Sequence, residues 1–384
     1  MPAWSGISWE KEEINSKSNP PKLHSLLDAK YHFRTLFDSS NGNYARSGIL
    51  DKEGNDTGID PFMASFPHLL DVGIMGHCQH GLSGKCAQAG IQCYQSGGSR
   101  DRPNMTFTDF ITIADQCAGK VHQFALGGRG DPDMHENFEE ILAYSRNKDI
   151  VPNMTTSGYG LTQESAKIIA RYCGAAAVSW YRNDYTYRAI EMLVAAGAVV
   201  NVHYVLSNDS IDEAIAILQS GKLPAGVSRM IFLLFKPVGQ GDYANVLSAG
   251  DYRIETLFSL IDAPEVTHIV GYDSCCVPAL VNYSQEIDPQ SYDTCEGARF
   301  SAYISADMWM TPCSFDQQGK YAVNLRNMTI SRAWESMEFE NFRDQLRNAC
   351  PECGHKDTCF GGCPITPEIV LCQNRQAILS GGIS

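Results

Sequence analysis

Short apolar runs rich in β-branched residues alternate with longer amphipathic stretches through the middle of the chain. Such alternation predicts strands that are each followed by a helix. The runs that predict strands are 69–75, 121–126, 150–155, 175–179, 199–206, 230–235 and 268–272. The stretches that predict helices are 106–118, 136–147, 162–173, 186–196 and 210–219. Repeated strand–helix units predict a parallel sheet, either doubly wound or wound into a barrel.

Two of these helices carry start signals. Thr162 precedes one helix with Glu164 close behind, and Ser210 precedes another with Glu213 three residues on, the pattern of a capping box. Six to seven units fit a partial or full barrel, and we expect an α/β fold with a partial (β/α)6 TIM-type barrel over residues 66–280. Chemistry in such barrels lies at the C-terminal ends of the strands.

The two ends of the chain differ from this middle part. Residues 1–65 are polar and turn-rich, and predict an N-terminal extension with one short helix near 23–37. After about residue 280 the alternation stops and cysteines crowd the sequence. Residues 281–384 are therefore expected to form a small second domain that is held together by metal.

Composition and charge narrow the class of protein. Of the 384 residues 43% are hydrophobic and 19% charged, which is globular composition. The formal charge of −14 argues against a nucleic-acid-binding surface. We find no apolar run of about 18 residues, and the start MPAWSGISWEKEE lacks the basic and apolar regions of a signal peptide. We therefore expect a cytoplasmic protein that binds neither nucleic acid nor membrane.

The 14 cysteines are the main chemical signal, and in such a chain they favour metal ligation over disulfides. Cys78, Cys86 and Cys93 follow the first predicted strand, with seven and six residues between them. Three thiolates on one loop suit an iron–sulfur cluster that keeps one iron open for a ligand. The alternative is a structural zinc site completed by His77 or His80.

A larger group of cysteines lies near the C-terminus. Its seven members are Cys295, Cys313, Cys350, Cys353, Cys359, Cys363 and Cys372. Seven thiolates exceed the needs of one tetrahedral metal, and two four-ligand sites need eight. The eighth ligand would come from Cys275 or Cys276, or its place would stay vacant. The alternative is a pair of zinc ribbons, because paired cysteines bind both metals.

A glycine pair directly follows the second predicted strand. Gly127 and Gly128 there allow a ligand to approach the backbone closely. A Gly-Gly turn also occurs for steric reasons alone. Its position one strand after the cysteine loop makes it a candidate ligand contact.

Together these features resemble the radical S-adenosylmethionine (SAM) enzymes of the SPASM subgroup, over roughly residues 68–372. The resemblance is most specific in the spacing from Cys350 to Cys372 and in the segments 299–304 and 361–364. Two departures stand out. The usual loop is CX3CX2C, whereas this one is CX7CX6C and retains only the aromatic Tyr94, so a ligand set with His77 stays open. Met308 also stands where the family has a glycine.

The resemblance implies three [4Fe–4S] clusters and SAM as cofactors. The first cluster would lie on the loop cysteines and chelate the amino and carboxylate groups of SAM. Gly127 and Gly128 match the motif that contacts the amino group, and Ser179, with Asn201 or His203, lies where the family binds ribose and carboxylate. Cys295, Cys313 and Cys363, with Cys275 or Cys276, would hold the first auxiliary cluster. Cys350, Cys353, Cys359 and Cys372 would hold the second.

The implied chemistry belongs to the cofactor: one electron splits SAM, and the 5′-deoxyadenosyl radical abstracts a substrate hydrogen atom. Because the subgroup mostly modifies peptides and proteins, we expect such a substrate, with crosslinking, epimerisation or oxidation as the outcome. The expected electron donor is a flavodoxin or ferredoxin. The alternatives are the same chemistry on a small molecule, a non-catalytic zinc protein, and an electron carrier.

Three residues at the end of the last barrel strand are candidates for catalysis. Cys275 and Cys276 follow Asp273 and are expected to face the cavity. If one thiol ligates a cluster, the other is spare and would return a hydrogen atom to a substrate radical, as an epimerase requires. If neither ligates, the first auxiliary cluster keeps an open iron for a substrate thiolate. Asp273 is a candidate base, or else a loop cap.

Overall fold

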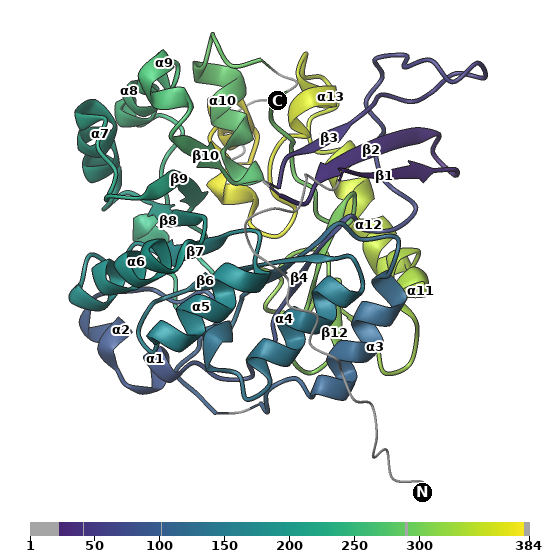
Figure 1. Ribbon diagram of the computed structural model, residues 1–384. Helices are drawn as coiled ribbons and strands as arrows, with labels where there is room; N and C mark the ends of the chain where they lie inside the picture. The colour runs from purple at the N-terminus through teal and green to yellow at the C-terminus, as the bar shows by residue number, and fades with distance from the viewer. Residues whose placement is uncertain (1–22, 41, 101, 289–290, 380–384) are drawn as a thin grey trace, which may run out of the picture.

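A ten-stranded sheet organises the chain in the computed structural model, which describes residues 23–40, 42–100, 102–288 and 291–379 (Figure 1). The sequence start MPAWSGISWEKEE lies outside these ranges. The sheet order is β10-β9-β8-β7-β6-β5-β4-β11-β12-β13. Its seven consecutive parallel strands are β4 (Leu69–Val72), β5 (Gln123–Leu126), β6 (Val151–Thr156), β7 (Ala176–Ser179), β8 (Val200–Leu206), β9 (Val227–Leu234) and β10 (Val270–Tyr272).

Each of these strands overlaps a run that the apolar pattern predicts, although β9 begins three residues before its run and β6 ends one residue after its run. Helices follow the strands. The longer helices are α3 (Phe107–Cys117), α4 (Phe138–Asn147), α5 (Gln163–Tyr172), α6 (Asp184–Ala196), α7 (Ile211–Ser220) and α8 (Tyr252–Ile261). The predicted α/β architecture with a parallel sheet is confirmed. Alternate strand residues such as Leu70, Val72 and Phe124 are fully buried and form the core between sheet and helices. None of the helices within the described ranges is long and apolar enough to cross a membrane.

Helix capping agrees with the sequence in one case and not in the other. Thr162 caps α5, and its partner in the capping box is Ser165. Ser210 makes no side-chain cap for α7, because its hydroxyl donates to Val205 O at 2.7 Å and accepts from Ser207 N at 2.8 Å. The predicted capping box at Ser210 is therefore wrong, and Glu213 instead forms an ion pair with Arg182.

The predicted helix near 23–37 is also wrong. The chain there forms β1 (Leu23–Asp28) and β2 (Phe33–Asp38), which with β3 (Tyr44–Arg46) make a three-stranded antiparallel sheet. The reason is a period of two: Phe33, Thr35 and Phe37 are buried, whereas the residues between them face outward. The buried side chains pack on the barrel, where Thr35 Oγ1 lies 2.8 Å from His122 Nε2.

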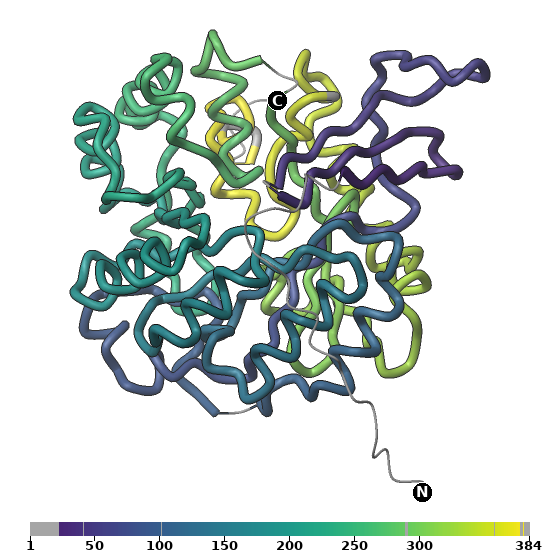
Figure 2. Tube along the Cα trace, in the orientation of Figure 1, coloured from purple at the N-terminus to yellow at the C-terminus, as the bar shows by residue number. Residues whose placement is uncertain are grey.

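The C-terminal part extends the sheet and then folds back across the barrel. β11 (Ser301–Ile304) pairs in parallel with β4, and β12 (Trp309–Thr311) and β13 (Val323–Asn324) follow antiparallel. Short and medium helices complete this part: α9 (Pro264–Thr267), α10 (Val277–Tyr283), α11 (Ile330–Trp334), α12 (Met337–Arg347), α13 (Lys356–Cys359) and α14 (Gln373–Leu379). The yellow tail lies between the green α10 region and the purple N-terminal strands (Figures 1 and 2).

Candidate functional site

The long cysteine loop after β4 is ordered by two single-turn helices, α1 (Gln79–Leu82) and α2 (Lys85–Gln88). Cys78 caps α1 and accepts a hydrogen bond from Gly81 N at 3.3 Å. A methyl group added at Gly97 would lie 3.7 Å from the Cys78 sulfur and 3.8 Å from the Cys93 sulfur. Cys86 interacts electrostatically with Cys93. The structure thus brings the three loop thiols together.

His80, one of the two histidines of this loop, is occupied by other contacts. His80 is 3% exposed, its Nε2 lies 2.5 Å from the Tyr185 hydroxyl, and its ring stacks on Tyr159 at 5.3 Å. Burial lowers the pKa of His80 to about 4. Within the described ranges no group of three or more His, Cys, Asp or Glu side chains is close enough to hold a single metal ion. Three thiols on one loop are the ligand set of a [4Fe–4S] cluster with one open iron, whereas a structural zinc ion would need a fourth ligand.

The glycine-rich turn after β5 packs directly against the cysteine loop. Gly130 has φ +82°, and a methyl group there would lie 2.4 Å from His77 O and 3.3 Å from Cys78 Cα. A methyl group at Gly128, which has φ +88°, would lie 2.9 Å from the Tyr303 hydroxyl. Only glycine satisfies both the backbone angle and the space at these two positions.

Two buried carboxylates follow this turn, and the sequence analysis did not single them out. Asp131 accepts hydrogen bonds from the Ser157 amide and hydroxyl, both at 2.6 Å, and interacts with Cys78. Both carboxylate oxygens of Asp133 are hidden from solvent and lack a hydrogen-bond partner among the described residues. Burial, and then the charge of Asp131, raise the pKa of Asp133 to about 7. The available signal was an Asp-Pro-Asp sequence at the end of a strand.

The residues proposed for ribose and carboxylate lie on β7 and β8. Ser179 ends β7 and pairs with His203 on β8, whereas Asn201 is level with Ala177, two residues deeper in the sheet. Burial lowers the pKa of His203 to about 4, and its Nδ1 lies 3.4 Å from Thr155 Oγ1. The end of β7 therefore brings Ser179 and His203 to one level, and Asn201 lies away from it.

A second group of thiols joins the end of β10 to the C-terminal part. Cys275 interacts electrostatically with Cys363 and Cys295, and Cys313 interacts with the same two. Burial raises the pKa of Cys295 to about 12, so this thiol is protonated until a metal displaces the proton. Cys276 is fully buried and turns away, with its sulfur 3.9 Å from Phe232 O on β9.

Asp273 is part of an ion pair. Its Oδ2 accepts hydrogen bonds from Lys236 Nζ at 2.8 Å and from Leu234 N at 3.2 Å. The Lys236 side chain is 2% exposed. Asp273 thus ties the end of β10 to the end of β9, as a residue that caps a loop does.

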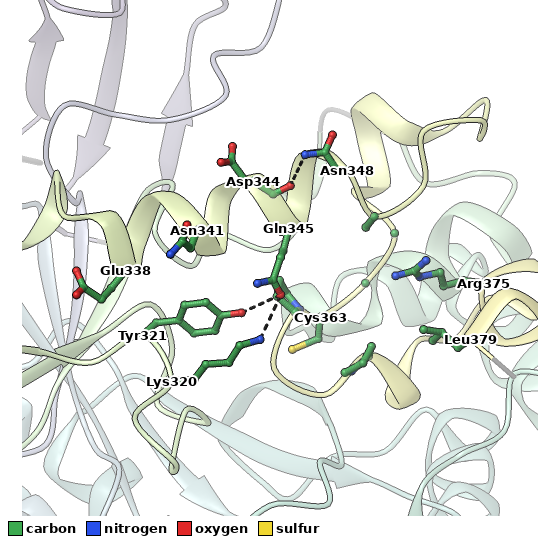
Figure 3. A pocket seen from close by; sticks show the side chains of 15 residues that line it. Lys320, Tyr321, Glu338, Asn341, Asp344, Gln345, Asn348, Cys363, Arg375 and Leu379 are labelled. Carbon is green, nitrogen blue, oxygen red and sulfur yellow. Dashed lines mark hydrogen bonds between the residues drawn. The ribbon is translucent and has the colours of Figure 1, made fainter. Parts of the chain in front are cut away.

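Four further cysteines near the C-terminus, Cys350, Cys353, Cys359 and Cys372, form a third group around α13. Cys359 interacts with Cys372, Cys350 and Cys353. A methyl group at Gly361, which has φ +68°, would lie 2.5 Å from the Cys350 sulfur. A cavity of about 650 Å³ opens beside this group between α12 and residues 361–367, and Cys363 lies on its wall (Figure 3).

Comparison with known proteins identifies a domain that carries five of the cysteines in the second and third groups. The model of the SPASM family, described as an iron-sulfur cluster-binding domain, matches residues 295–359. The C-terminal part of the chain is a SPASM domain. The domain supplies Cys295, Cys313, Cys350, Cys353 and Cys359 within the matched range. Iron–sulfur clusters are thereby supported as cofactors of this chain.

Relatives extend the likeness beyond the SPASM domain. "Mycofactocin maturase MftC" of Mycobacterium tuberculosis is 22% identical over 307 residues, and the match covers 73% of this chain and 76% of the relative. The protein of the same name from Mycobacterium ulcerans is 24% identical over 340 residues, and that match covers 80% of this chain and 87% of the relative.

Solved structures share the fold. Streptococcus suis SuiB bound to S-adenosylmethionine has a TM-score of 0.67 at 15% identity, covering 91% of this chain and 98% of SuiB. The protein anSMEcpe with bound AdoMet has a TM-score of 0.59 at 16% identity, covering 82% of this chain and 95% of that chain. With the SPASM match, these likenesses confirm the resemblance to the SPASM subgroup of radical SAM enzymes.

Proposed function

We propose that this protein is a radical SAM enzyme that abstracts a hydrogen atom from a peptide or protein substrate. The observation that carries the proposal is the sorting of the cysteines into three groups. Three thiols gather at the end of β4, four at the end of β10 and four around α13. Each group has the number of ligands that one [4Fe–4S] cluster takes, the first with one iron left open.

The first group and the turn after β5 would bind SAM, which supplies a 5′-deoxyadenosyl radical on one-electron reduction. Asp131 and Asp133 lie beside the cysteine loop, where the ammonium group of an amino acid would stabilise the ionised form of these buried carboxylates. The glycines at 127 and 128 leave the backbone of this turn accessible to the same group. Ser179 and His203 lie level with each other for ribose and carboxylate.

The second group favours Cys275 as the fourth ligand of the first auxiliary cluster. Cys275 faces Cys295 and Cys363, whereas Cys276 packs against β9 without exposed surface. With this ligand set neither an open iron nor a spare cavity thiol is left. The geometry therefore favours an outcome in which neither thiol acts on the substrate, such as oxidation or carbon–carbon crosslinking, over epimerisation by a returned hydrogen atom.

A peptide substrate is proposed from two of the structures that share the fold. One is SuiB bound to the precursor peptide SuiA, with a TM-score of 0.66, and the other is anSMEcpe with AdoMet and the Cp18Cys peptide, with a TM-score of 0.59. A flavodoxin or ferredoxin is the proposed electron donor. The same radical chemistry on a small molecule is the second candidate.

The proposal is tested by purifying the protein without oxygen, reconstituting iron and sulfide, and incubating it with SAM and dithionite. We expect about twelve irons per chain and formation of 5′-deoxyadenosine. Cys86→Ala should lose about four irons together with the SAM cleavage, whereas Cys173→Ala, outside the three groups, should lose neither. Zinc in place of iron, or about eight irons without cleavage, contradicts the proposal.

A further inference from the structure

One buried ion pair lies beside the second group of thiols. Lys236 follows β9 and is 4% exposed, which is rare for a lysine and requires a fixed partner. Its ammonium donates to Asp273 Oδ2 at 2.8 Å and to Leu234 O at 2.9 Å. It also lies 4.3 Å from the centre of the Phe315 ring. All of these contacts are inside the protein, so the position of the charge is fixed.

The charges of this pair reach the thiols. Lys236 interacts electrostatically with Cys275 and Cys313, and Asp273 with Cys275. Phe315, which covers the ammonium, stacks in turn on Tyr94 of the cysteine loop at 4.3 Å between ring centres. The pair thus lies between the loop after β4 and the second group of thiols. Of the four thiols in the second group, Cys363 borders the cavity shown in Figure 3.

We propose that the Lys236–Asp273 pair sets the reduction potential of the first auxiliary cluster, with Lys236 raising it and Asp273 lowering it. The inference rests on the proposed function, because it needs a cluster on Cys275, Cys295, Cys313 and Cys363. A [4Fe–4S] cluster gains one negative charge when it accepts an electron. A buried cation nearby stabilises that charge and a buried anion destabilises it. Lys236 and Asp273 therefore act on the cluster through their fixed charges, and they are positioning residues and not catalytic residues.

The test is a redox titration of the reconstituted full chain with dithionite, in which each auxiliary cluster takes up one electron and is followed by electron paramagnetic resonance. Cys78, Cys86 and Cys93 are replaced by Ala in every sample, so that the loop cluster gives no signal. Asp273→Asn keeps the shape of the side chain and removes its charge. It should increase the equilibrium constant for reduction of one auxiliary cluster by about tenfold, which raises the midpoint potential of that cluster by about 59 mV for one electron.

Lys236→Gln should shift the same cluster downward, and the double variant should return close to the unaltered potential. The control is Lys222→Gln, an exposed lysine that precedes the opposite end of β9 and removes the same charge. It should shift neither cluster. If Lys236→Gln does not fold because Asp273 is left without a cation, Asp273→Asn and the double variant still carry the test.

The outcomes separate the inference from the proposed function. Shifts of opposite sign confined to one cluster support it. Single variants that shift the potential in the same direction, or not at all while both auxiliary signals are present, overturn it. An unaltered chain that binds no first auxiliary cluster, as judged by its iron content, overturns the proposed function and the inference together.

Discussion

The Asp133 carboxylate is the single group near the cysteine loop that most needs a ligand. A buried carboxylate without a hydrogen-bond partner is costly, and a bound cation would remove that cost. We predict that Asp133→Asn weakens SAM binding by about tenfold, or about 1.4 kcal/mol. Calorimetric titration of the reconstituted protein measures this, with the exposed Asp209→Asn after β8 as the matched control.

Binding of a second ligand tests whether Asp133 acts through its charge or through its shape. 5′-Methylthioadenosine has the nucleoside and sulfur of SAM but no ammonium group. Its affinity should be equal in the unaltered protein and in Asp133→Asn. Equal losses for both ligands would mean that Asp133 shapes the site and does not bind the ammonium.

Gly130 packs the turn after β5 directly against the backbone of the cysteine loop. Gly130→Ala must move His77 O, which lies 2.4 Å from the new methyl group, whereas Gly119→Ala has a similar φ of +72° and open space around it. Gly119→Ala should cost about 1 kcal/mol of stability, and Gly130→Ala should cost more and also lower the iron held by the loop. Denaturant titration and iron analysis check this. An equal cost at both sites would contradict the packing argument.

The N-terminal sheet and the barrel meet at two buried histidines, and this contact depends on pH. Burial, and for His68 the neighbouring His122, lower the pKa of His68 to about 3 and of His122 to about 4. The folded protein therefore keeps both rings neutral, while the unfolded chain protonates them below about pH 6.5. Their contribution to stability is complete above that pH and is lost as the pH falls toward 4, at up to about 1.4 kcal/mol per unit for each ring.

We predict that the double variant His68→Gln/His122→Gln has a flatter dependence of its unfolding midpoint on pH between 7 and 4.5 than the unaltered protein. His268→Gln, at an exposed position after α9, should keep the original slope. Thermal unfolding followed by circular dichroism at a series of pH values provides the measurement. An unchanged slope in the double variant would place the acid sensitivity elsewhere.

Helices and strands were predictable from the sequence where the apolar residues follow the period of a helix or form the continuous run of a buried strand. All seven parallel strands overlap the predicted runs, because each contains an apolar run that is buried in the sheet. The helix expected near 23–37 failed because a period of two over so few residues is visible only once the partner strand and the barrel bury Phe33 and Phe37. Ser210 failed as a cap because its hydroxyl bonds Val205 O instead.

The sequence predicted which types of residue make up the site, but it did not predict which side chains contact one another. The spacing of the cysteines predicted a loop group and a C-terminal group, and the resemblance to the SPASM subgroup implied the division of the C-terminal group into two ligand sets. Cys275 and Cys276, however, are neighbours in sequence and differ only in the direction that the turn after β10 gives them. The charge partner of Asp273 comes from the adjacent strand, and no local pattern announces it. Contacts of this kind depend on the whole fold.

Across the molecule as a whole, Arg299 connects parts of the chain that are far apart in the sequence. It is the first residue of the segment 299–304, one of the most specific parts of the resemblance to the SPASM subgroup. Its side chain is buried, and it donates to Phe62 O at 2.6 Å, to Thr294 Oγ1 at 2.8 Å and to Cys295 O at 3.2 Å. The guanidinium also lies 4.4 Å from the centre of the Phe360 ring. One planar cation thus connects the N-terminal region, the second group of thiols and the segment around α13.

Lysine retains the charge but cannot make this fork of hydrogen bonds or stack in the same way. We therefore predict that Arg299→Lys lowers the free energy of unfolding by about 2 to 3 kcal/mol, whereas the exposed Arg332→Lys in α11 changes it little. Because Cys295 O loses a donor, the variant should also release iron to a chelator faster. Hydrogen exchange should rise in residues 23–46 and 350–372 at the same time. Faster exchange in only one of these segments would show that Arg299 stabilises that end alone and does not couple the two.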